Sequence, residues 1–302
     1  MKSLLDAGIL TLTVLAMLSV GLELEIHRFR QLTKHILPLA VALLTQIILI
    51  PIVGLAVSYG LDLSPTLRSG ILLVAACPVG DIANFFALIG RGNLAVSVAY
   101  NAISCLISPL SMTIVFAGYG RILGTPFAFA APGWRLVLPF FFLITVPIIA
   151  GVGLRLVRAP KIDRISRSLR FVCLAGVFTL CAVVIVSRFD QLKTDWRFAA
   201  SASALLALAA MTIGWTVSRV LRMEQANRLA LLISFAVRNV GLATAIAIAI
   251  MNRIEYAVFS TVYFLTEVVL VLGAVAAFRA VGPSSGKLQL FGFTTKPRSQ
   301  PQ

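Results

Sequence analysis

Residues 71–90 read ILLVAACPVGDIANFFALIG, and residues 229–250 read LALLISFAVRNVGLATAIAIAI. Each stretch is long enough to cross a bilayer, yet each carries a charge near its middle, Asp81 in the first and Arg238 in the second. A charge at that depth costs about 2.5 kcal/mol or more. Gly, Pro or Asn residues flank both charges. Because polar residues at a helix break near the membrane centre form the binding sites of transporters, the two stretches predict a carrier.

The composition indicates a membrane protein with many spans. Hydrophobic residues make up 59% of the 302 residues and charged residues 12%, and the mean hydropathy is +0.98. A soluble domain carries about 25% charged residues. The formal net charge of +15 does not indicate a nucleic-acid partner, because the basic residues lie in short loops between apolar segments rather than on one soluble face. The expected fold class is therefore all-α and polytopic, with the lipid bilayer as partner.

Nine apolar segments are long enough to span the bilayer. They cover residues 4–22, 36–58, 67–90, 94–118, 134–157, 168–187, 197–219, 228–251 and 256–279. We expect residues 1–280 to form one transmembrane unit. Residues 281–302 are rich in Gly, Ser, Pro and Lys, which predicts a disordered tail.

The basic residues predict the orientation of these segments. They are concentrated in the loops on one side of the membrane, most clearly between Arg155 and Arg170. Basic loops stay in the cytoplasm, so the tail is predicted to be cytoplasmic and the N-terminus to lie outside. The expected location is the inner (plasma) membrane of a bacterium.

The third and fourth segments align with the eighth and ninth without a gap when position 68 is placed on position 228. The alignment matches residues 68, 72, 76, 83, 87 and 98 with identical residues, and it places 78–84 on 238–244. With nine spans the two copies have opposite topology. Inverted repeats with matching broken helices are a known plan of transporters.

The two charges each have a structural and a functional interpretation. Pro78 and Gly80 interrupt the helix before Asp81, so this carboxylate could simply cap the second half-helix. Arg238 keeps its charge at ordinary pH and needs an anion, carbonyl oxygens or water. It could form a structural ion pair with Asp81, or serve as a substrate or coupling charge beside Asn239. The two roles of Arg238 are compatible.

Other polar residues lie within the apolar segments. The fourth segment carries a stripe of small polar residues at helical spacing, which either pack against other helices or line a site. Gln46 is a lone amide with the same two interpretations. Glu267 is a further intramembrane charge that needs a partner. The stripe consists of Ser97, Asn101, Ser104 and Ser108. No catalytic, metal-binding or nucleotide-binding motif is present, and the four cysteines are expected to be buried hydrophobic residues, so we predict no enzyme.

The sequence resembles the bile acid:sodium symporter family over nearly the whole transmembrane region. The motifs are CPVGDIAN followed by GRGNLAVSVAYNAISCLISPL, then FAVRNVGLATAIA, and LTQIILIPIVG before the first of them. The resemblance implies a core domain with two crossing discontinuous helices and a panel domain beside it. The core would comprise about 36–118 and 197–279, and the panel about 4–22 and 134–187.

The resemblance also implies two sodium sites behind the crossing. Asn84, Ser97 and Asn101 match positions of the first site, and Gln46 matches the glutamine of the second. The family's shared glutamate falls at Ser234, and its second-site glutamine falls at Arg238. No cofactor other than sodium is expected, and these two departures argue against ordinary sodium coupling.

We therefore hypothesise that the Arg238 guanidinium replaces one sodium ion and pairs with Asp81. The expected function is secondary transport of a small organic anion. Two alternatives stay open. One is a proton-coupled or uncoupled carrier, or an efflux protein, of related architecture, with Asp81 as the proton site. The other is a non-transporting membrane protein in which Asp81 and Arg238 form a purely structural pair.

Overall fold

The computed structural model describes residues 2–24, 36–124, 134–157 and 162–281, which are nearly all helical. Residues 282–302 of the predicted tail lie outside the described residues, and Val281 is the last residue of α13. The helices in chain order are α1 (Lys2–Glu23), α3 (Ile36–Gly60), α4 (Pro65–Ala76), α5 (Ile82–Ile89), α6 (Leu94–Leu123), α7 (Trp134–Phe140), the π-helical turn η2 (Phe141–Thr145), α8 (Val146–Leu156), α9 (Ile162–Ser187), α10 (Phe189–Val220), α11 (Gln225–Ala236), α12 (Val240–Ala245), the π-helical turn η3 (Ile246–Ile250), the 3₁₀ turn η4 (Ile254–Tyr256) and α13 (Ala257–Val281).

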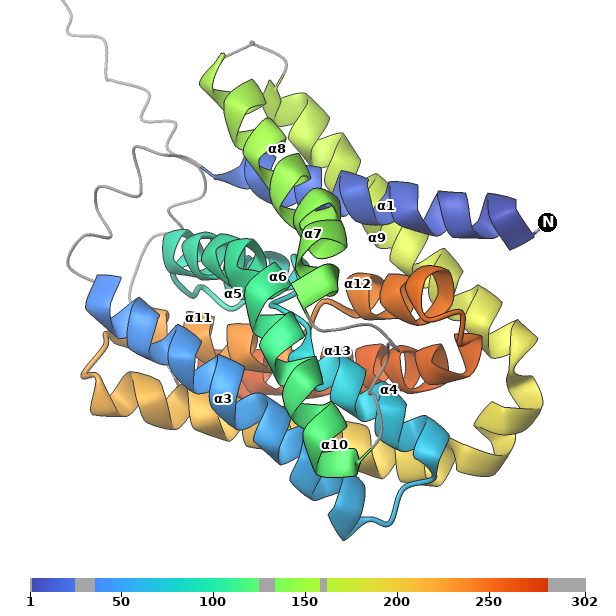
Figure 1. The fold of residues 1–302 in the computed structure, drawn as a ribbon. Coiled ribbons are helices and arrows are strands. Elements are labelled where there is room, and N and C mark those ends of the chain that lie inside the picture. Colours follow the sequence, from blue (N-terminus) through green and yellow to red (C-terminus); the bar gives the residue numbers. More distant parts are fainter. Residues whose placement is uncertain (1, 25–35, 125–133, 158–161, 282–302) are drawn as a thin grey trace, which may run out of the picture.

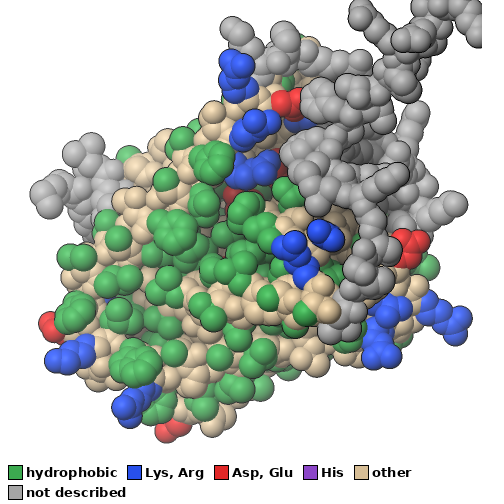
Figure 2. Space-filling view, turned by 180° about the vertical axis from the view of Figure 1, so that it is seen from behind, with side chains coloured by type: hydrophobic (Ala, Val, Ile, Leu, Met, Phe, Trp, Pro, Cys, Tyr) green, Lys and Arg blue, Asp and Glu red, His purple; other side chains and the backbone are tan. Residues whose placement is uncertain are grey.

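Six of the described helices are long and apolar enough to cross a membrane, and three shorter apolar helices accompany them. This confirms an all-α polytopic membrane protein, while the count of nine spans stays a prediction. Large apolar side chains remain exposed, as a lipid-facing surface requires. On α3 the most exposed of them are Ile36, Leu37, Leu44, Ile48 and Ile52. Figure 2 shows hydrophobic side chains over the middle of one face, with charged side chains mostly toward its margins.

Both predicted breaks are present. The segment 67–90 is divided into α4 and α5, and the segment 228–251 into α11 and α12. α9 and α10 are longer than the predicted spans, and only Arg188 separates them. The predicted spans cover only the apolar part of each helix. α10 begins at Phe189 and includes the mostly polar residues that precede the predicted span 197–219.

The alignment of the two copies recurs in the local geometry. α4 and α11 have the same length, and both of their ends fall on matched positions of the alignment. The turns that precede them also match, because Asp62 and Arg222 are both left-handed, at φ 45° and 51°. After each turn an arginine bonds a carbonyl near the start of the helix, Arg68 to Leu63 and Arg228 to Met223. Equivalent hydrogen bonds in the two halves support the predicted repeat.

The helices form two sets around the breaks. α1 packs against η2, α8 and α9, whereas α10 packs against α3, α11 and α13. Figure 1 shows α1 and α8 together above the broken helices, with α3 and α10 below them. α1 and α9 also contact α12, so the first set lies against the break of the second repeat. The division of these helices into a panel and a core stays a prediction.

Candidate functional site

The two breaks meet at an antiparallel bridge between Val79 and Arg238. The amide of Gly80 donates to the Val237 carbonyl at 3.1 Å, and the amide of Asn239 donates to the Pro78 carbonyl at 2.9 Å. We call residues 77–81 and 237–239 the crossing. Each strand-like segment thus bonds backbone groups of the other segment, which the breaks have left without helical partners. Lipid could not bond these groups.

The backbones at the crossing are too close for a side chain at Gly80. A Cβ atom there would lie 2.7 Å from the Arg238 carbonyl oxygen and 3.3 Å from a Val237 methyl group. We expect Gly80→Ala to destabilise the protein by about 1–3 kcal/mol, because overpacked backbones must move apart. Gly118→Ala is the matched control, since nothing lies within 4 Å of a Cβ there. Thermal unfolding of both variants tests this. Equal melting temperatures would contradict it.

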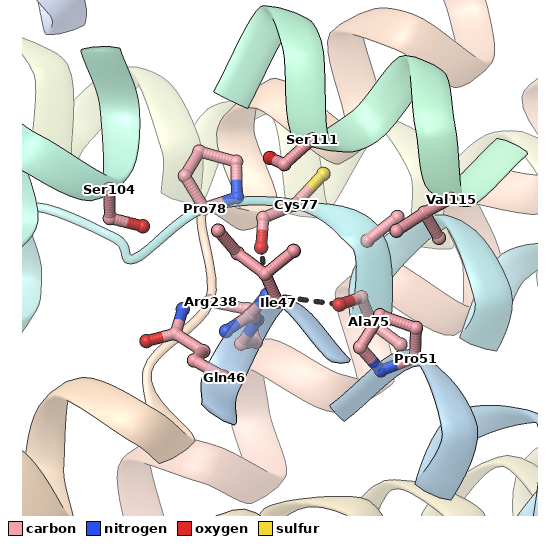
Figure 3. A pocket seen from close by; sticks show the side chains of 11 residues that line it. Gln46, Ile47, Pro51, Ala75, Cys77, Pro78, Ser104, Ser111, Val115 and Arg238 are labelled. Atoms are coloured by element: carbon pink, nitrogen blue, oxygen red, sulfur yellow. Dashed lines mark hydrogen bonds between the residues drawn. The ribbon is translucent and has the colours of Figure 1, made fainter. Parts of the chain in front are cut away.

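The Arg238 guanidinium is buried among backbone carbonyls. Its Nη2 atom donates to the Ala75 carbonyl at 2.9 Å and to the Cys77 carbonyl, at the broken end of α4 (Figure 3). The residue is only 3% exposed, and its Nε and Nη1 atoms have no partner among the described residues. A fixed cation therefore faces the oxygens that a helix break makes available for binding a metal ion.

Glu267 is an acidic residue that bonds the backbone of Arg238. It is fully buried on α13, and its Oε2 atom accepts the backbone N–H of Arg238 at 3.1 Å. Its Oε1 atom has no partner among the described residues. The third intramembrane charge that the sequence singled out thus contacts the crossing, where it holds the Arg238 backbone. No ion pair within 4 Å joins its carboxylate to the guanidinium, so it offsets the buried cation only over a longer distance.

Asp81 does not pair with Arg238. Both residues are described, and no ion pair within 4 Å joins them, so the expected pair is wrong. Asp81 stands at the first turn of α5 but makes no side-chain capping bond, so the capping interpretation is also wrong. The two residues lie in matching breaks but not at matching positions, since the alignment places Arg238 on Pro78 and Asp81 on Gly241, and the crossing backbones direct the two side chains to different neighbours. Asp81 is partly exposed, whereas Arg238 is enclosed.

A small cavity lies beside the guanidinium. It is lined by Gln46 and Pro51 of α3, by the end of α4, and by Ser104 and Ser111 of α6 (Figure 3). Its volume is about 10 Å³, which is about the room that one water molecule needs. The Gln46 Oε1 atom accepts the Tyr100 hydroxyl at 2.6 Å. Gln46 and Arg238 therefore line one small cavity, and their roles at a sodium site stay predictions.

The residues predicted for the first sodium site are only partly joined. The Ser97 hydroxyl donates to Asn84 Oδ1 at 2.9 Å. Asn101 is fully buried and accepts the Cys105 thiol at 3.3 Å. Ser234 instead donates to the Ala230 carbonyl of its own helix. Asn239 caps α12 by accepting the Leu242 amide at 2.9 Å. The carboxylate that the family places at Ser234 has no counterpart in this set.

Glu23, which the sequence did not single out, reaches the same place from α1. Its Oε2 atom accepts Asn84 Nδ2 at 2.7 Å, and its Oε1 atom lies 2.8 Å from Arg170 Nη2 of α9. The Glu23 side chain is only 7% exposed. The sequence gives no signal for this role, because Glu23 follows the last residue of the predicted segment 4–22, where a carboxylate ordinarily faces water. The packing of α1 against the broken helices encloses it instead.

A model of the sodium bile acid symporter family matches residues 10–195 of this chain. A Bacillus subtilis protein named "Uncharacterized sodium-dependent transporter YocS" is 24% identical over 233 residues, 77% of this chain and 71% of the relative. The rice protein named "Probable sodium/metabolite cotransporter BASS2, chloroplastic" is 31% identical over 207 residues, 68% of this chain and 48% of the relative. The rat "Sodium/bile acid cotransporter 5" is 25% identical over 175 residues, 56% and 40% of the two chains. This chain thus spans about half the length of the plant and rat relatives or less.

Proposed function

Because this chain belongs to the sodium bile acid symporter family, and is therefore an integral membrane transporter rather than an enzyme, we propose that it carries a small organic anion across a bacterial inner membrane. The observation that carries the proposal is the crossing of two broken helices beside a second set of helices. Half-helix N-termini at such a crossing favour anionic groups of a solute. The names of the relatives, sodium/metabolite and sodium/bile acid cotransporters, agree with an organic acid.

We propose that α1, α7–α8 and α9 act as the panel and the remaining transmembrane helices as the core, with the N-terminus outside and the C-terminus in the cytoplasm. Movement of one set against the other would expose the crossing to each side in turn. The solute would bind between them, where Asp81 is partly exposed. Since Arg238 does not neutralise that carboxylate, organic acids with a hydrogen-bond donor or amino group beside the acid are the best first candidates.

We propose that transport is coupled to one sodium ion fewer than the two that the family resemblance implies. The second sodium site has a guanidinium on the carbonyls of Ala75 and Cys77, and a further cation there would be repelled. The first site keeps neutral oxygen donors at Asn84, Ser97 and Asn101. Sodium favours hard oxygen ligands, and this set lacks the family's carboxylate, so weak binding of one ion is expected there.

A second candidate is proton coupling, which the Asp81 carboxylate favours, because it is partly exposed and forms no ion pair with any of the described residues. The purely structural role for an Asp81–Arg238 pair loses its basis, because the two side chains make no ion pair. In proton coupling, Asp81→Asn would abolish acceleration by a pH gradient.

Uptake into proteoliposomes tests the proposal. We expect radiolabelled organic acids to accumulate in the vesicles, and a sodium gradient to accelerate their uptake by about tenfold or less. A tenfold change in rate corresponds to about 1.4 kcal/mol, which is as much as one weakly bound ion is expected to contribute. Vesicles of known orientation separate import from efflux. A panel of organic acids that is neither bound nor moved under any gradient would contradict a transport function.

A further inference from the structure

We propose that Glu23 is a positioning residue that latches the panel to the first cation site. The panel can then separate from the crossing near Asn84 only when the Glu23–Asn84 bond breaks. The inference rests on the proposed carrier function, since a carrier needs two sets of helices that separate. It adds a residue from the panel to a site otherwise made of core residues.

The latch is a continuous line of four side chains from four helices. Arg170 of α9 lies 2.8 Å from Glu23 of α1. Glu23 accepts Asn84 Nδ2 of α5 at 2.7 Å, and Asn84 accepts the Ser97 hydroxyl of α6 at 2.9 Å. The first two helices belong to the panel and the last two to the core. Separation of the two sets therefore has to break the middle bond.

The geometry fixes Asn84 at both ends of its amide. Its Nδ2 atom is held by the panel and its Oδ1 atom by Ser97. Asn84 is 3% exposed, so neither bond is readily replaced by water. An Asn84 oxygen can turn to a cation only after these bonds rearrange. The latch thus links the state of the cation site to contact between the two sets of helices.

The bond is strong enough to bias a conformational equilibrium. A buried hydrogen bond to a charged group favours the closed arrangement by about tenfold or more. By contrast, the Arg155–Asp163 ion pair joins two panel helices, and its carboxylate is 81% exposed. Asp163 therefore provides a matched control, a largely exposed panel carboxylate that pairs with an arginine of another panel helix.

Two native cysteines of α9 report on opening. Cys173 follows Arg170 by one helical turn and is 2% exposed. Cys181 lies two turns further along the same helix and is 5% exposed. Separation of the panel from the crossing near the latch should expose Cys173, while Cys181 reacts when α9 as a whole comes loose.

The test is the rate at which a charged methanethiosulfonate reagent modifies each thiol of the full-length protein in lipid nanodiscs, followed by mass spectrometry of the peptides. In Glu23→Ala we expect Cys173 to react about tenfold faster or more, with Cys181 unchanged. Glu23→Gln keeps an acceptor oxygen for Asn84 and should stay within about threefold of the parent. Asp163→Ala should match the parent.

Asn84→Ala removes the same bond from the core and should accelerate Cys173 equally. The double variant should then be no faster than either single variant, because all three lack one shared bond. Unchanged labelling of Cys173 in both single variants, or equal acceleration of Cys173 and Cys181, would overturn the latch. Labelling needs no transported solute, so a failure of the proposed transport function leaves this result interpretable.

Discussion

Glu267→Gln should destabilise the protein by about 3–5 kcal/mol, the cost of leaving the buried Arg238 charge uncompensated, although the Glu267 carboxylate acts on that charge from beyond ion-pair distance. Glu267 is fully buried and accepts the Arg238 backbone N–H, while the Arg238 guanidinium has only backbone carbonyls as partners among the described residues. Without the Glu267 charge, that cation is no longer offset. We expect the melting temperature to fall by roughly 10 °C.

A double-mutant cycle separates charge compensation from packing. Glu267→Gln combined with Arg238→Gln should cost less than the sum of the two single variants, by about 1–3 kcal/mol. Glu255→Gln is the control, because that carboxylate is 24% exposed and pairs with Arg188 and Arg253 outside the crossing. It should cost about 1 kcal/mol or less. Additive effects of the two crossing variants would show that Arg238 and Glu267 are energetically independent.

Arg238→Gln should make uptake more dependent on sodium, by about tenfold or more in the ratio of rates with and without a sodium gradient. The substitution removes the guanidinium from the carbonyls of Ala75 and Cys77 and leaves the Glu267 carboxylate without a nearby cation. Carbonyl and carboxylate oxygens are hard ligands that suit sodium. Gln46, on the same cavity, can add an amide oxygen.

Initial rates in proteoliposomes, with sodium replaced by choline at constant ionic strength, measure this ratio. Arg68→Gln is the matched control, because Arg68 lies at a helix end, where it bonds the Leu63 carbonyl and lies 3.9 Å from Asp62. It should leave the ratio unchanged. An Arg238→Gln variant that transports at the parent rate with the parent ratio would contradict a cation role for the guanidinium.

The sequence predicted the two broken helices because each of their signals is local, whereas their crossing was implied by the family resemblance. A proline, a glycine and charges within an apolar run specify a broken helix wherever the run packs. The gapless alignment of the two copies then predicted which two breaks correspond. The repeated arginines at 68 and 228 and the matching bounds of α4 and α11 show that the correspondence extends to local hydrogen bonds.

The side-chain partners could not be predicted in the same way. Asp81 and Arg238 lie in corresponding breaks, yet a contact depends on where two crossing backbones direct their side chains, which no local pattern encodes. Glu23 illustrates the same limit. Its importance comes from the packing of α1 and α9 against the crossing, and its sequence neighbourhood is that of an ordinary helix end.

A sodium titration of thermal stability tests most directly the claim that the Arg238 guanidinium occupies the place of a sodium ion. Purified parent protein and Arg238→Gln would be titrated with sodium chloride against choline chloride. A bound ion stabilises by about 2.7 kcal/mol at a concentration one hundred times its dissociation constant. We predict a saturable, sodium-specific rise in melting temperature for Arg238→Gln that exceeds any rise in the parent. A sodium-specific rise in the parent as large as in Arg238→Gln would contradict the claim.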